Sequence, residues 1–265
     1  MTTIAFIPTT TRARGTDFRA VPDVLRSDWI KLTTVRTYRA ILAVTGVVGA
    51  FAAWAVATFV TDEVLTVADV FVYSTFLTAV FAAVAGILLF SAEAQHGTLA
   101  ISLTAQPARW VLAVSKTVIA AAVGLALGAT GMAAGLAGSV LGGLDMGDTT
   151  GMATTTAWAL LFTALGAVLG LGVGMVVRHG SGAISGLLVW WLVVENLLWF
   201  FLPAPVSRFL PFYAGGALLG VDTDTATVET MAVALSRPQD ALVFGAYAAL
   251  ALLAGTVLLY RRDTN

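Results

Sequence analysis

Six long apolar stretches constrain this chain more than any other feature of its sequence. A membrane-spanning helix needs about 20 consecutive, mostly apolar residues, and six stretches meet that length without Lys or Arg in their cores. They lie near residues 40–60, 70–90, 117–143, 153–177, 183–202 and 241–260. Hydrophobic residues form 58% of the chain, against roughly 45–50% in soluble domains. Because no ten-residue alternation typical of an outer-membrane barrel is present, the sequence predicts an all-α integral membrane protein with six transmembrane helices.

The distribution of basic residues predicts the orientation of these helices. Positive residues accumulate in cytoplasmic loops. Here they occupy the N-terminal flank, the second loop, the Arg178-His179 turn and the C-terminal Arg261-Arg262 pair. The first and third loops carry only acids, and the loop at residues 203–240 carries more acids than bases. We therefore expect a multi-pass protein of the cytoplasmic membrane, with both termini in the cytoplasm.

The residues before the first stretch divide into two parts. Residues 1–21 are rich in Thr and Arg and predict a flexible cytoplasmic tail, whereas residues 22–39 predict an amphipathic helix on the inner membrane face. Its apolar stripe and the basic residues beside the stripe are Leu25, Trp29, Lys31, Leu32 and Arg36. The alternative is a plain basic flank that only sets topology.

Several classes of chemistry lack the residues they need. The sequence contains no phosphate-binding loop, no G-x-S-x-G and no H-E-x-x-H. It has no cysteine and only His96 and His179, so we expect no metal site, no catalytic residue and no cofactor in this chain. The net charge of −1 gives no field that would attract nucleic acid. The sequence predicts a protein that is not an enzyme.

One acid lies inside a predicted span, at Glu195 in LLVWWLVVENLLWF, and is followed by Asn196. It is roughly 4 Å from the midpoint of the fifth span, where a charge costs on the order of 3 kcal/mol. Such a residue serves a substrate path, a proton relay or the attachment of a helix. The alternative is a hydrogen-bonded structural acid nearer the outer interface.

The segment EAQHGTLAISLTAQPARW, residues 93–110, is the only sizeable predicted cytoplasmic loop between spans. Gly97 and Pro107 predict the ends of a short helix over Thr98–Gln106. Arg109 and Lys116 are expected to anchor the next span at the headgroups. The alternative is that any short polar loop has this composition.

These residues resemble the membrane subunits of type-2 ABC transporters. In that family an acid precedes a Gly-Thr or Gly-Ser pair, followed by an apolar helix, a proline, an arginine and a lysine that enters the third span. The matching residues here are Glu93, Gly97, Thr98, Pro107, Arg109 and Lys116. The opening SDWIKLTTVRTYRAILA and the later VVEN…FLPFYAGGAL also resemble family patterns, with Asn196 in place of the usual proline.

The resemblance implies an exporter in which paired six-helix subunits bind separate cytoplasmic ATPase subunits that carry ATP-Mg. The loop at residues 91–110 would couple the two, and Glu93 would pair with a base on the ATPase or with Arg109. The second permease copy would be identical or homologous, and residues 203–240 would form an outer loop with re-entrant helices. Two alternatives stay open: an ion-coupled secondary transporter that uses Glu195, and an intramembrane enzyme built on Glu195 and Asn196.

The orientation is testable because the chain has no native cysteine. Single cysteines at Thr149 and Thr223 should react with an impermeant maleimide in intact cells. Cysteines at Gln95 and Asp263 should react only after permeabilisation. Labelling of Gln95→Cys from outside would reverse the predicted topology.

Overall fold

A computed structural model describes residues 20–34, 36–60, 64–70, 73–105, 108–220 and 233–261. Within these ranges the regular structure is entirely helical, without strands, which confirms the all-α fold. Several positions that the sequence singled out lie outside the described residues: the tail at residues 1–19, the side chain of Lys31, Pro107, Thr223 and Asp263.

Six helical segments in the described ranges are long and apolar enough to cross a membrane, so the chain is a multi-pass membrane protein. Their bounds are Arg36–Phe59 (α2), Val67–Gln95 (α3, Val67–Val70, then α4, Tyr73–Gln95), Arg109–Leu141 (α6), Met152–Val177 (α7), Gly180–Phe201 (α8, Gly180–Val189; η1, Trp190–Glu195; α9, Asn196–Phe201) and Arg237–Arg261 (α13).

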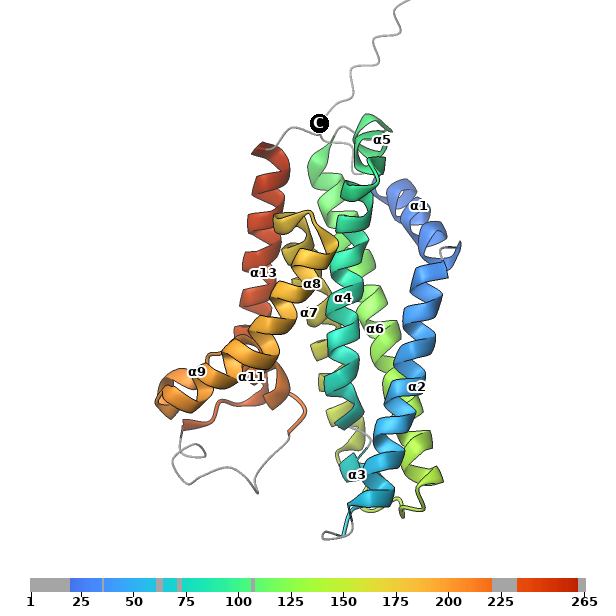
Figure 1. Cartoon of the computed structure of the whole chain (residues 1–265), viewed down its shortest axis with the longest axis vertical. Helices are drawn as coiled ribbons and strands as arrows, with labels where there is room; N and C mark the ends of the chain where they lie inside the picture. Colours follow the sequence, from blue (N-terminus) through green and yellow to red (C-terminus); the bar gives the residue numbers. More distant parts are fainter. Residues whose placement is uncertain are drawn as a thin grey trace, which may run out of the picture.

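Four shorter helices lie beside these segments: α1 (Ala20–Thr34), α5 (Thr98–Ala105), α10 (Ala204–Ser207) and α11 (Pro211–Ala217). Figure 1 shows α1 and α5 at the end of the bundle where α13 finishes, and α3 at the opposite end. The segment from α8 to α9 slants away from the bundle, and α11 lies beside it, well short of the end marked by α3. The four short helices therefore lie in two regions of the bundle, and each region contains one candidate site.

Close contact between backbones holds the centre of the bundle together. A Cβ atom at Gly170 of α7 would overlap the carbonyl oxygen of Ala83 of α4, and one at Gly124 of α6 would lie 2.5 Å from the carbonyl oxygen of Thr163 of α7. Glycine at these positions lets the helices approach closely, as small residues do in lipid. The G-x-x-x-G spacings thus serve packing within the chain.

An aromatic cluster joins α11 to four of the membrane segments. The rings of Trp191 and Phe212 stack in parallel, with centroids 4.0 Å apart. Phe76, Phe162 and Phe244 complete the cluster through tilted and edge contacts. Because these rings come from α4, α7, η1, α11 and α13, the short helix α11 packs as part of the core.

The boundary between the interfacial helix and the first span differs from the expected one at residue 40. Helix α1 ends at Thr34 and α2 begins at Arg36, so Arg36 and Arg39 belong to the first span. The hydroxyls of Thr33 and Thr34 bond to the carbonyl of Ile30, at 3.0 and 2.7 Å. Bonds of this kind satisfy the threonine hydroxyls within the helix.

Candidate functional site

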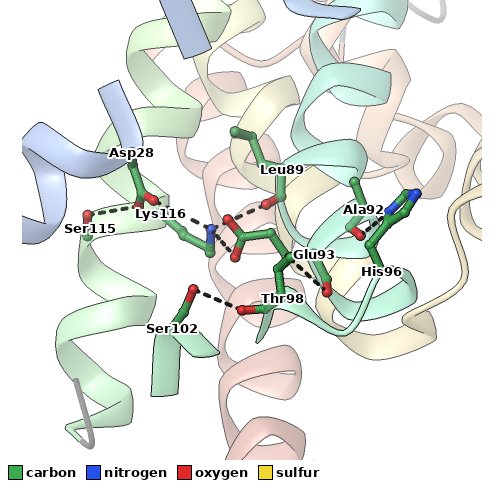
Figure 2. Close-up of polar contacts among 9 residues, drawn as sticks. All are labelled: Asp28, Leu89, Ala92, Glu93, His96, Thr98, Ser102, Ser115 and Lys116. Carbon is green, nitrogen blue, oxygen red and sulfur yellow. Dashed lines mark hydrogen bonds and ion pairs between the residues drawn. The ribbon is translucent and has the colours of Figure 1, made fainter. Parts of the chain in front are cut away.

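A buried lysine at the start of α6 is the centre of the first candidate site. The Lys116 ammonium lies 2.9 Å from Oε2 of Glu93, at the end of α4. It also donates a 3.3 Å hydrogen bond to the carbonyl of Leu89. Only 3% of the Lys116 side chain is exposed, so the charge depends on these partners rather than on water. Figure 2 shows the acid and the base facing each other between α4 and α6.

Helix α1 contributes a second acid to the same site. Asp28 is buried, and its Oδ1 lies 4.0 Å from Nζ of Lys116. Ser115, next to the lysine, donates a 3.3 Å hydrogen bond to Oδ2 of Asp28. We call Asp28, Glu93 and Lys116 the ionic cluster. It connects the interfacial helix, the end of the second span and the start of the third (Figure 2).

The structure corrects one expectation about this region. Glu93 was expected to pair with Arg109 or with a base on the ATPase, and within this chain its base is Lys116 rather than Arg109. Lys116 was expected to anchor the next span at the headgroups, and its side chain is buried within the bundle. Arg109 instead donates to the backbone carbonyl of Leu259 and thereby joins the start of α6 to the end of α13. The sequence missed Asp28 as a site residue, although its place three residues after Leu25 puts it on the same face of α1.

The loop after Glu93 has the geometry that its glycine predicted. Gly97 has a φ of +72° and no atom within 4 Å of a Cβ position, so its conformation rather than space requires glycine. Helix α5 starts at the next residue, and the Thr98 hydroxyl donates to the carbonyl of Glu93 at 3.3 Å. Ser102 donates to the carbonyl of Thr98 at 3.2 Å. The turn and α5 are thus bonded directly to the residue that carries the ion pair.

The predicted stripe of the interfacial helix packs mainly against protein. Leu32 is buried, and Leu25 packs against the same core cluster of α4, α6 and α7 residues. Trp29 is 55% exposed and Ile30 is 51% exposed. One face of α1 therefore belongs to the bundle, and the exposed side chains of Trp29 and Ile30 are free to meet lipid.

The second candidate site surrounds Glu195, which is buried at the end of η1. Its Oε1 accepts a 2.6 Å hydrogen bond from the backbone N–H of Tyr213, in the first turn of α11. The first N–H groups of a helix have no partner within the helix, and a carboxylate there also meets the positive end of the helix dipole. Glu195 therefore caps α11 from a distant span.

Asn196 supports the π-helical turn next to this acid. Its side-chain amide donates to the carbonyls of Trp191 and Leu192, both at 3.2 Å. A π-helix shifts the backbone bonding pattern and often occurs at functional sites. Asn196 bonds to carbonyls of its own helical segment, whereas Glu195 bonds to α11. The two residues are neighbours in sequence but have separate partners.

Neither site, as far as the structure describes the chain, contains a group of residues that could bind a metal ion. In the described ranges no three His, Asp or Glu residues lie close enough to hold a metal ion. The ionic cluster can hold elements together and transmit displacement, and Glu195 can attach α11 to the fifth span. Comparison of the sequence with family models and with curated proteins finds no match. The evidence for a function therefore consists of the geometry of the two sites and the resemblance to the membrane subunits of type-2 ABC transporters.

The ionic cluster makes a prediction about stability. Lys116→Met removes the buried base that Asp28 and Glu93 share, which should lower the free energy of unfolding by about 3–5 kcal/mol. Adding Glu93→Gln should restore part of this loss, because one of the two acidic charges next to the lost base disappears. Thermal unfolding of the purified protein in detergent measures both effects. Arg261→Met, at an exposed base, is the control, and equal melting of Lys116→Met and Arg261→Met would contradict the assigned role.

The cap of α11 makes a second prediction. Glu195→Gln keeps an oxygen that accepts from Tyr213, so it should unfold close to wild type. Glu195→Leu removes the acceptor of the part-buried Tyr213 N–H, which should cost about 1–3 kcal/mol. Chemical unfolding of the two variants, with Ser185→Leu at an exposed polar residue of the same span as control, measures the difference. Equal stability of the Gln and Leu variants would exclude the capping role.

Proposed function

We propose that this chain is the membrane subunit of an ATP-driven ABC exporter in the cytoplasmic membrane. It would form the substrate path together with a second permease copy, and a separate ATPase subunit would bind ATP-Mg. The chain itself would carry no catalytic residue. The resemblance supplies the family, and the geometry around Lys116 supplies the reason to place the coupling function at residues 91–110.

The observation that carries the proposal is the connection from α5 to the membrane helices. Thr98 bonds to the backbone of Glu93, and Glu93 forms the ion pair with Lys116. A displacement of α5 therefore acts on the ends of α4 and α6 together, and Asp28 adds α1 to the same unit. A coupling element needs such a connection, because force from a soluble partner must reach the spans without loss in a flexible loop.

Helix α5 also has a surface suited to a partner protein. Leu99 is buried against the bundle, whereas Ile101 is 70% exposed. Figure 1 shows α5 beyond the ends of the neighbouring membrane helices, which is where a soluble domain has access to it. An exposed isoleucine on a helix that is fixed on its other side provides an apolar contact at low cost in conformational entropy.

The observed partner of Glu195 bears on the secondary-transporter alternative. A proton site has to bind and release its proton during the cycle, whereas this carboxylate accepts from the backbone of α11. Its position favours an outer cap that is held to the fifth span. We therefore keep ion-coupled transport as the outcome to be distinguished, and assign Glu195 the attachment of α11.

Crosslinking tests the coupling proposal directly. The full-length chain is affinity-purified from its native membrane, and ATPases in the eluate are identified by a phosphate-binding loop. Ile101→Cys should crosslink to that ATPase, whereas Thr149→Cys, at the α6–α7 loop, should not. Gly97→Val should abolish the crosslink but leave membrane insertion intact, because a β-branched residue is strained at positive φ.

Two outcomes would overturn the proposal. One is that no such ATPase co-purifies and none crosslinks to Ile101→Cys. The other is transport by reconstituted protein that persists without ATP and stops when the proton gradient is collapsed, which would establish the secondary transporter instead.

A further inference from the structure

An open apolar groove lies between the elbow formed by α1 and α2 and the faces of α4 and α6. Its volume is about 230 Å³. Its lining includes Trp29, Arg39, Leu42, Ala122, Ala126 and Leu127. Apart from Arg39, Thr33 and Tyr38, every lining residue is hydrophobic. The groove is independent of the transport function proposed above.

The groove results from how α2 diverges from α6. Toward the α3 end the two helices touch through their backbones, since a Cβ at Gly49 would lie 3.0 Å from the carbonyl oxygen of Gly131. At the other end the lining from α4 and α6 includes three small side chains, Ala85, Ala122 and Ala126, beside Val123 and Leu127. The small alanine side chains leave the groove between α2 and α6. Helix α1 covers this groove on one side, and its other side is open to the exterior of the bundle.

Positive charge lies at the mouth of the groove. Arg36 and Arg39 are exposed in the first turn of α2, where the span begins and the membrane surface is expected. Among the described residues neither arginine has a carboxylate within ion-pair distance, since Asp28 and Glu93 are directed to Lys116. The exposed ring of Trp29 is also typical of the membrane interface.

We propose that this groove is a binding site for an anionic phospholipid of the cytoplasmic leaflet, with one acyl chain in the groove and the phosphate on Arg39. An apolar channel beside a guanidinium matches the two parts of such a lipid, because arginine forms paired hydrogen bonds to phosphate oxygens. The volume is below the roughly 300–1,000 Å³ of pockets that enclose whole small molecules. It therefore suits part of a single chain.

The bound lipid would also support the ionic cluster. Leu32 and Tyr38 line the groove and also line the cavity of about 240 Å³ that contains Asp28, Glu93 and Lys116. These two side chains form the partition between lipid and charge. An acyl chain on one side of the partition holds α1 in the position from which Asp28 reaches Lys116.

Fluorescence quenching in nanodiscs tests the site on the full-length chain. Thr33→Cys, the only cysteine in the variant, carries a bimane fluorophore at the groove. The nanodiscs contain phosphatidylcholine with increasing amounts of phosphatidylglycerol or phosphatidylcholine that bears a nitroxide on its acyl chain. The anionic lipid should reach half-quenching at about fivefold lower mole fraction, the effect of one basic residue near an anionic membrane surface.

Two pairs of variants separate the headgroup from the chain. Arg39→Gln should make the two lipids quench equally, whereas Arg261→Gln, at an exposed arginine outside the groove, should keep the preference. Ala126→Leu should reduce quenching by both lipids by filling the groove, whereas Ala129→Leu, exposed one turn further along α6, should not. Equal quenching by the two lipids in the parent protein, or a preference that survives Arg39→Gln, would overturn the proposal.

Discussion

The buried charge of Lys116 determines how one end of this molecule is organised. An ammonium withdrawn from water is stable only if opposite charge and hydrogen-bond acceptors replace its hydration. Glu93, Asp28 and the carbonyl of Leu89 provide these. Each comes from a different turn or helix, so satisfying one charge fixes the relative positions of α1, α4 and α6. The loop that carries α5 starts from the same acid.

The length of α6 explains how a charged cluster exists in a membrane protein at all. Its 33 residues span about 50 Å, well beyond the roughly 30 Å of a hydrocarbon core. Ala122 lies level with Arg39, because both line the groove beside α2. Lys116 precedes Ala122 by six residues, or about 9 Å, on the side toward α5. The cluster is thus enclosed by protein toward the α5 end of α6 rather than at the middle of this helix, and a charge away from the bilayer centre costs less than one at the centre.

Features that follow from a local sequence pattern could be predicted from the sequence, whereas contacts between distant residues could not. The spans follow from composition over 20 residues, and the Gly97 turn and α5 follow from local turn chemistry, so both were predictable. The Lys116–Glu93 pair joins residues 23 positions apart on two helices, and Arg109 was the base nearer in sequence. Asp28 is 88 positions from Lys116, and only packing brings α1 to α6. The boundary between α1, which ends at Thr34, and α2, which begins at Arg36, leaves no mark in an apolar stripe.

Glu195 and Lys116 are buried ionisable residues at two different places in the bundle, and both need polar partners within the protein. Each is a buried ionisable residue on a membrane segment, and each is satisfied by a group on or beside a short helix, the N-terminus of α11 or the acid that leads to α5. Between them lies the α4–α7 contact, where Gly170 meets the Ala83 carbonyl without space for a side chain. Close packing of this kind resists internal deformation. If α5 couples to an ATPase as proposed, its displacement would reach α11 through rigid movement of α4 with α7, and the aromatic stack of Trp191 on Phe212 would pass that movement to α11.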